Sequence, residues 1–187
     1  MSKWTAILFL SVVFAAFTAM NRGAYKGYFS DDEVDNLSWT PHVPAKEFAR
    51  AAATPRFLEY NFRPVGHLYF KAMERLFGLD FPKWVGAIHL LHFLNIWLVW
   101  ALARKLGAGP PAAAAGVLFF AFHMALFDAL WKPMYVFDVA CATFCLTSLI
   151  CFIDRRWVLS FVSFWLAYKS KELAVMQIGR ASCRERV

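Results

Sequence analysis

Long, almost uncharged apolar runs constrain this sequence more than any other feature. The main runs are Trp4 to Met20, Trp84 to Ala103, Ala112 to Ala129 and Tyr135 to Ile153. At about 1.5 Å of helix per residue, each covers most or all of a bilayer core of about 30 Å. With 60% hydrophobic and 18% charged residues, the 187-residue chain is too apolar for an ordinary soluble domain. The sequence therefore predicts an all-α polytopic membrane helix bundle.

Two of the apolar runs leave the number of spans open. Trp157 to Tyr168 would form a helix of about 18 Å, which does not cross the bilayer core alone, so four to five spans are expected. The first run could instead be a secretory signal. Phe17-Thr18-Ala19 fits a cleavage site poorly, and we therefore favour a retained helix.

Basic residues indicate the orientation of the bundle. Lys3, Arg104-Lys105 and Arg155-Arg156 fall at alternating ends of successive spans, which predicts a cytoplasmic N-terminus in a multi-pass protein of the inner (plasma) membrane. The segment 21–83 would then form the first extracytoplasmic loop. Because the basic residues punctuate apolar runs instead of forming one patch, the net charge of +7 does not indicate a nucleic-acid partner.

The last ten residues, 178–187, read IGRASCRERV and resemble the translation of a common short-read sequencing adapter. They hold three arginines and one glutamate, so without them the net charge falls from +7 to +5. We expect this tail to be non-native, with residues 1–177 as the N-terminal part of a longer membrane domain. The alternative is a genuine basic tail.

A cluster of carboxylates opens the long loop, at Asp31, Asp32, Glu33 and Asp35. One interpretation is structural: Ser30 and Glu33 form a capping box, with the aspartates in the first helical turn. The other is functional, since clustered carboxylates raise one another's pKa and can leave one as a general base or metal ligand. The sequence alone leaves both open.

Two helices are expected later in this loop. The first covers Ala45 to Ala53, and the second begins at Arg63-Pro64 and ends near Gly78. The second has an apolar face and a polar face, and we expect it to lie on the outer membrane interface; a soluble helix packed on a loop domain is the alternative. The expected apolar face holds Val65, Leu68, Tyr69, Ala72, Met73, Leu76 and Phe77, and the polar side holds His67, Lys71, Glu74 and Arg75.

Polar residues inside the apolar runs are candidates for a site or for interhelical hydrogen bonds. His89, His92 and Asn95 recur at three-residue spacing, and for the histidines a structural role is favoured. Asp128 and Asp138 flank the outer hairpin turn and are expected to line the mouth of a water-filled cavity. The motif Lys169-Ser170-Lys171-Glu172 interrupts apolar sequence where the last helix should reach the outer face. Its ammonium groups could hold a lipid phosphate, or the motif could be a solvated helix end.

Together these features resemble the type C membrane glycosyltransferases, in the branch of bacterial protein O-mannosyltransferase-like enzymes. The resemblance covers nearly all of residues 1–177 and depends on the order and spacing of its motifs. These are Asp31-Asp32-Glu33, Phe62-Arg63-Pro64, Leu76-Phe77-Gly78-Leu79, His92-Phe93-Leu94-Asn95, Phe122-His123, Trp131 with Asp138, and Ser170-Lys171-Glu172.

The resemblance implies an inverting sugar transfer from a polyprenyl-phosphate donor to an acceptor on the extracytoplasmic side. It implies that an aspartate of the first outer loop is the base; we choose Asp32, with Asp31 and Glu33 beside it. The residues that the resemblance and the charge pattern favour for substrate binding are Arg63, Asp128, Asp138, Lys171 and Glu172. No cofactor is certain, and a requirement for Mg²⁺ or Mn²⁺, like the identities of sugar and acceptor, stays open.

The main rival interpretation is a non-catalytic membrane protein, such as a transporter or scaffold, whose acidic loop only caps helices. No internal repeat of the kind found in many transporters is visible in the sequence. A phosphotransferase would need a different arrangement of Asp and His on the cytoplasmic turns, which hold little beyond Arg, Lys and Gly. We expect residues 1–177 alone to be inactive.

Overall fold

The structure is a computed structural model that describes residues 3–56 and 62–175 of this chain. Every regular element in those residues is an α-helix or a short 3₁₀ helix, which confirms the expected all-α class. The segment 178–187, expected to be non-native, lies outside the described residues.

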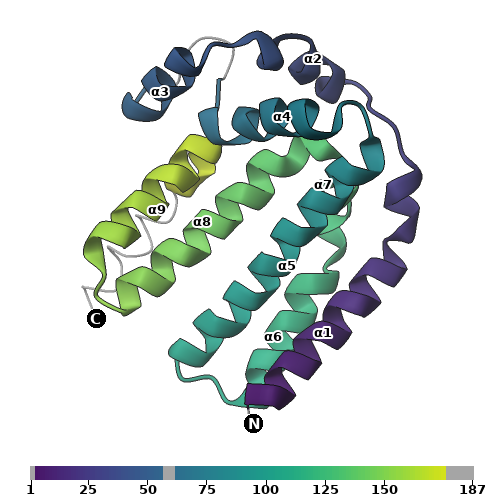
Figure 1. Ribbon diagram of the computed structural model, residues 1–187. Coiled ribbons are helices and arrows are strands. Elements are labelled where there is room, and N and C mark those ends of the chain that lie inside the picture. Colours follow the sequence, from purple (N-terminus) through teal and green to yellow (C-terminus); the bar gives the residue numbers. More distant parts are fainter. Residues whose placement is uncertain (1–2, 57–61, 176–187) are drawn as a thin grey trace.

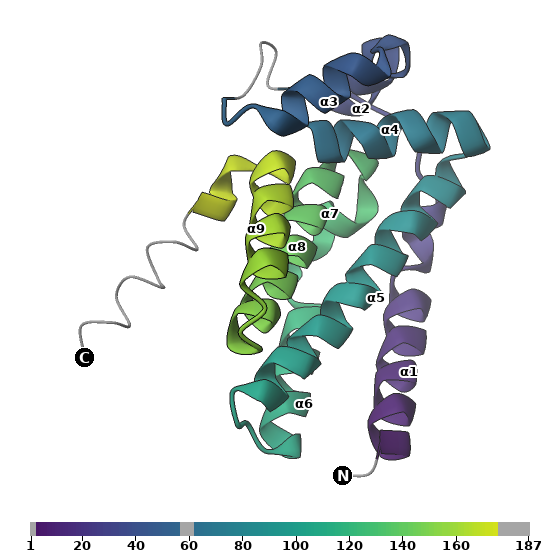
Figure 2. The same cartoon turned by 60° about the vertical axis from the view of Figure 1, so that its left-hand side comes forward.

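The helices form a bundle that is covered at one end by a crosswise layer (Figures 1 and 2). Along the bundle run α1 (Lys3–Met20), α5 (Phe81–Lys105), α6 (Pro110–Phe122), α8 (Val136–Ile153) and α9 (Trp157–Ser170). The crosswise layer consists of α2 (Asp32–Trp39), α3 (Ala45–Ala53) and α4 (Pro64–Phe77). Short helices connect these elements: η1 (Arg22–Lys26), η2 (Thr40–His42), η4 (Met124–Leu126), α7 (Phe127–Trp131), η5 (Pro133–Tyr135) and η6 (Glu172–Val175). In the bundle, α8 packs against both α5 and α9, and α1 packs against α5 and α6.

The lengths of the helices support a membrane protein. Among the described residues, Phe81–Lys105 and Pro133–Ile153 are long and apolar enough to cross a bilayer, and a third span results if α6 and Met124–Trp131 form one bent span. Large apolar side chains are exposed on the outer sides of α1 and α9, including Trp4, Leu8, Val158 and Phe161. Such surfaces need lipid or further protein to cover them.

The expected third run, Ala112 to Ala129, is not one straight helix. α6 ends at Phe122, and the segment Met124–Trp131 continues at an angle of 44°. His123 at the break has extended backbone, and its Nδ1 atom accepts a hydrogen bond from the N–H of Ala125 at 3.2 Å. The imidazole thus caps η4 in place of a continued helical ladder.

Three polar residues of α5, His89, His92 and Asn95, connect this helix to its neighbours, as the structural interpretation of these residues predicts. His89 bridges the Tyr25 hydroxyl, 2.8 Å from Nδ1, and the Leu130 carbonyl, 2.9 Å from Nε2. Asn95 donates from Nδ2 to the Val139 carbonyl of α8 at 3.0 Å. His92 is buried against the rings of Phe17 on α1 and Phe120 on α6.

α3 and α4 have the expected bounds, but the expected faces of α4 are partly wrong. His67, which periodicity places on the polar side, is buried, whereas Leu68 and Leu76 are 55% and 68% exposed. The reason is that α4 packs on two sides, against α2 and α3 above and against the bundle below (Figure 2). Gly66 permits the crossing over α8, since a Cβ there would lie 2.0 Å from the Phe137 ring.

Candidate functional site

Glu33 connects the carboxylate cluster to the rest of the fold. Its Oε2 atom accepts a hydrogen bond from the Ser30 N–H at 3.0 Å, which is half of the expected capping box. Its Oε1 atom accepts one from the Met134 N–H of η5 at 3.3 Å, and the residue is 1% exposed. Burial raises the pKa of Glu33 above its ordinary value, although the two N–H donors and nearby Lys132 oppose this shift. Glu33 therefore ties α2 to the beginning of α8.

The two aspartates before Glu33 are exposed. The sequence predicts Ser30 as the N-cap, but α2 begins at Asp32 with Asp31 as its N-cap, and the Asp31 side chain makes no cap hydrogen bond. Asp31 has φ 45° and ψ −124°, a conformation that favours glycine. Asp32 occupies the first helical position in ordinary geometry. Neither carboxylate forms an ion pair with another residue of the described ranges.

Four of the expected substrate-binding residues meet below the crosswise layer, and we call them the charged cluster: Arg63, Asp138, Lys171 and Glu172. Arg63 binds Glu172 with two hydrogen bonds, from Nε at 3.0 Å and from Nη2 at 2.7 Å. Lys171 donates from Nζ to Asp138 Oδ1 at 2.5 Å. The guanidinium of Arg63 also lies 5.7 Å from the centre of the Phe137 ring. The cluster thus joins the N-terminus of α4, the first turn of α8 and the end of α9.

The surroundings of Glu172 favour its charged form. Burial opposes ionisation of Glu172, but the hydrogen bonds and charge of Arg63, with Lys171 nearby, hold the pKa of Glu172 below its ordinary value. Each cation faces one carboxylate, and an ammonium group has three donor positions while a guanidinium has five. A phosphate could therefore share these cations without removing their carboxylate partners.

Beside the cluster, His67 was not identified as a site residue from the sequence. Its Nε2 atom lies 2.9 Å from the Asn36 Oδ1 of α2, and its Nδ1 atom lies 3.0 Å from the Arg63 backbone nitrogen. Burial lowers the pKa of His67 to about 4, so the ring is neutral at pH 7. The hydrogen bonds link α2 to the segment that carries Arg63. Spacing gave no signal for this role, because the helical period places His67 on the expected polar side of α4, whereas the residue is buried.

The end of α9 is buried and is not the solvated helix end that the sequence allowed. Lys169 and Ser170 are 1% and 0% exposed. Lys169 donates from Nζ to the Arg56 carbonyl at 3.2 Å, and Trp165 donates from Nε1 to the Ala52 carbonyl at 2.7 Å. Lys169 thus holds the segment after α3, which leaves Lys171 as the ammonium group at the cluster.

Asp128 is not brought to the charged cluster. It is exposed on α7, and its carboxylate forms no ion pair within the described part of the chain. Over the same residues, no group of three His, Cys, Asp or Glu side chains is placed to hold a metal ion. Comparison of the chain with protein-family models, curated proteins and solved structures finds no match.

Proposed function

We propose that this chain belongs to a membrane-embedded, inverting glycosyltransferase that transfers a sugar from a polyprenyl-phosphate donor to an acceptor at the crosswise end of the bundle. The observation that carries the proposal is the charged cluster. Arg63 and Glu172, 109 positions apart, are joined there beside Lys171 and Asp138. This end also holds the carboxylates of α2, so a candidate base and candidate phosphate-binding cations share one side of the bundle (Figure 1).

In the proposed reaction, Asp32 removes the proton of the acceptor hydroxyl as its oxygen attacks the anomeric carbon. The bond from that carbon to the phosphate oxygen breaks, and the electron pair leaves with the polyprenyl phosphate. Lys171 and Arg63 stabilise the developing negative charge, while Asp138 and Glu172 hold the two cations in position. Asp32 suits the role of base better than Glu33, because Glu33 is buried and already accepts two backbone hydrogen bonds.

The proposed membrane arrangement has four to five spans and a cytoplasmic N-terminus in the inner (plasma) membrane. α1, α5, the bent pair of α6 and α7, and α8 would cross the bilayer, with α9 as a complete or partial fifth span. The crosswise layer would then lie at the extracytoplasmic interface. In support, α4 exposes the apolar side chains Leu68 and Leu76 on the side away from its packed faces.

A non-catalytic scaffold is the second candidate, and the ion pairing within the cluster favours it. Lys171 and Arg63 each already contact a carboxylate, and Glu33 accepts two backbone hydrogen bonds, which are contacts that a purely structural joint would make. In this alternative the cluster only fastens the crosswise layer to the bundle.

Sugar transfer measured by mass spectrometry separates the two candidates. The assay uses the complete gene product in detergent with synthetic polyprenyl-phosphate sugars as donors. We expect transfer, and we expect Asp32→Asn to lower turnover by roughly 10²-fold or more while the thermal unfolding temperature stays unchanged. Asp31→Asn, one residue away, should lower turnover by less than Asp32→Asn does. No transfer from any prenyl-phosphate donor by the folded protein, or normal turnover of both variants, would favour the scaffold.

A further inference from the structure

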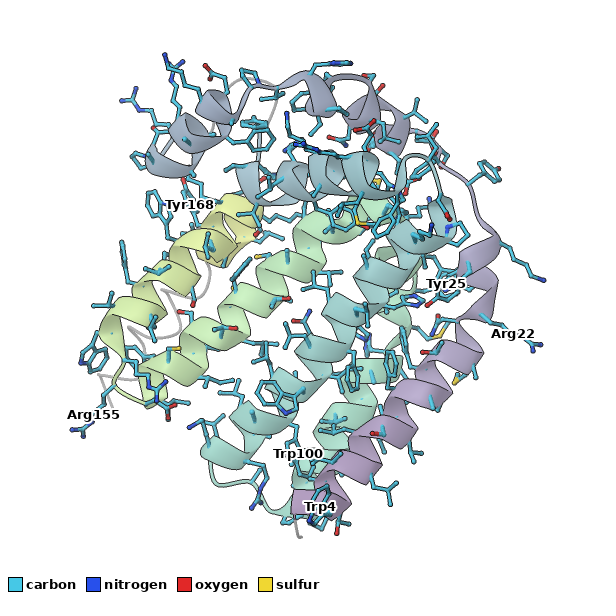
Figure 3. The ribbon with its side chains drawn as sticks, in the orientation of Figure 1. Trp4, Arg22, Tyr25, Trp100, Arg155 and Tyr168 are labelled. Atoms are coloured by element: carbon cyan, nitrogen blue, oxygen red, sulfur yellow. The ribbon has the colours of Figure 1, made fainter. Side chains whose placement is uncertain are left out.

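The end of the bundle opposite the crosswise layer carries a dense group of cations. It comprises Arg104 and Lys105 at the end of α5 and Arg155 and Arg156 in the turn between α8 and α9, against the single carboxylate of Asp154. Lys105 donates from Nζ to Asp154 Oδ1 at 2.5 Å, which joins the two turns. Arg155 projects from this end, remote from Tyr168 at the crosswise end (Figure 3).

Between these two turns lies a cavity of about 430 Å³. Its walls are formed by Lys105, Leu106, Phe152, Ile153, Arg155 and Trp157. Two of these side chains are cations and four are apolar. The rings of Phe152 and Trp157 meet edge to face with their centres 5.0 Å apart, which gives the apolar wall a defined shape.

This combination selects a particular ligand chemistry. A soluble phosphate would be satisfied by the cations alone and would leave the apolar wall exposed to water. A phospholipid presents a phosphodiester next to glycerol and acyl chains, so it can contact both kinds of wall at once. The net positive charge of the two turns favours a lipid whose headgroup carries net negative charge.

We propose that this cavity binds an anionic phospholipid. Lys105 and Arg155 contact the phosphate, while Leu106, Phe152, Ile153 and Trp157 receive the glycerol and the first part of the acyl chains. The site is separate from the charged cluster and does not depend on the proposed sugar transfer.

The backbone of Arg155 provides an independent observation. This residue has φ 58°, in the left-handed region that favours glycine, at the turn that ends α8. Glycine would suit the turn better, and the arginine instead supplies a cation to the cavity. The variant Arg155→Gly therefore removes the cation without disturbing the turn.

Native mass spectrometry of the purified chain, mixed with equal amounts of phosphatidylglycerol and phosphatidylcholine, tests the proposal. We expect preferential retention of phosphatidylglycerol and a loss of about fivefold in each of Arg155→Gly and Lys105→Gln. Asp154→Asn breaks the same ion pair as Lys105→Gln but leaves the ammonium group, so it should retain the lipid at least as well as the wild type. Arg22→Gln, which removes an exposed cation of η1, is the matched control.

Three outcomes would overturn the proposal. The first is equal retention of the two lipids, or equal retention of phosphatidylglycerol by Arg155→Gly, Lys105→Gln and the Arg22→Gln control. The second is a loss of phosphatidylglycerol retention in Asp154→Asn as large as in Lys105→Gln. The broken ion pair alone would then explain the loss, and the ammonium group of Lys105 would have no role in binding the lipid. The third is displacement of the lipid by inorganic phosphate at equal concentration, which would show a site for phosphate without its lipid.

Discussion

Glu33 shows at the scale of one residue how burial couples a carboxylate to stability. Its pKa is raised by burial, so the folded protein binds this proton more tightly than the unfolded chain does. The stabilising contribution of the proton is fully present below the ordinary value of 4.5 and is lost as the pH rises through the higher folded value. The side chain is held in place by two backbone N–H groups, of Ser30 and Met134, that donate to its carboxyl oxygens.

We predict that Glu33→Gln lowers stability at pH 7 by roughly 1–3 kcal/mol, because the amide NH₂ must face one of the two backbone donors. The gap in unfolding temperature between wild type and variant should widen as the pH falls toward 4.5, since only the wild type can take up the proton. Thermal unfolding in detergent measures both effects. Asp32→Asn, on the exposed side of the same turn, should change stability by less than about 0.5 kcal/mol. A gap that narrows at acidic pH would contradict this account of Glu33.

Residue-level signals in the sequence were reliable where the contacts are local. The Ser30–Glu33 spacing predicts the carboxylate contact with the Ser30 N–H, which lies within one helical turn. The same spacing cannot predict the contact of Glu33 with Met134, 101 positions away, nor the left-handed conformation of Asp31. Both depend on how α2 meets the beginning of α8.

At the scale of elements, the packing of α4 across α8 depends on the absence of a side chain at Gly66. A Cβ there would overlap the Phe137 ring, so we predict that Gly66→Ala costs about 1–3 kcal/mol despite the better helix propensity of alanine. Gly116 on α6 has nothing within 4 Å of the same position. Gly116→Ala should therefore stabilise by about 1 kcal/mol. The unfolding temperatures of Gly66→Ala and Gly116→Ala provide the measurement. Equal shifts in the two variants would rule out the close crossing of α4 over α8.

The ion pair between Arg63 and Glu172 fastens α4 to the end of α9. Because the Glu172 pKa is lowered, the pair should contribute stability above the ordinary glutamate value of 4.5 and lose it as the pH falls through the folded value. We predict a coupling energy of about 0.5–1 kcal/mol at pH 7 from a double-mutant cycle of Arg63→Gln and Glu172→Gln, since Glu172 is half exposed. The coupling should decrease as the pH falls below 4.5 and vanish at pH values where Glu172 is protonated in the folded protein. A coupling energy that persists at those pH values would come from packing between the two side chains and not from their charges.

Helix bounds could be predicted, but the partners of each helix could not. Pro64 and Gly78 mark the ends of α4 by their own backbone preferences, so its expected bounds agree with the structure. The pairing of Arg63 with Glu172, by contrast, results from the way the bundle brings α9 beneath the crosswise layer. His67 was assigned to the wrong face for the same reason, because periodicity assumes one buried side and α4 has two.

At the scale of the whole molecule, basic clusters that are far apart in the sequence lie at the same end of the bundle. The start of α1, the α5–α6 turn and the α8–α9 turn lie at the same end of the bundle (Figure 1). Lys3, Arg104-Lys105 and Arg155-Arg156 therefore belong to one end, and the charged cluster belongs to the other. The alternation expected from the sequence is consistent with this arrangement. For successive basic clusters to lie at the same end, the chain must run along the bundle an even number of times between them.

This separation gives a prediction about orientation. Positive charge close to the ends of spans stays on the cytoplasmic side, so the end with Arg104 and Lys105 should face the cytoplasm and α2 should face outside. Suitable reporters are Ser38, exposed on α2, and Gly109, exposed in the α5–α6 turn with φ −63°. Gly107 in the same turn is unsuitable, because its φ of 86° disfavours a side chain.

We predict that Ser38→Cys reacts with a membrane-impermeant maleimide in intact cells, whereas Gly109→Cys reacts only after the membrane is permeabilised. The native cysteines are replaced by alanine in both variants, so that any labelling comes from the introduced thiol. Labelling with a permeant maleimide checks that both thiols are reactive. Because the proposed base is on α2 and its acceptor must reach it from outside, the reverse pattern would contradict both the orientation and the proposed sugar transfer. Labelling of both sites in intact cells would mean that the bundle does not separate the two sides of a membrane.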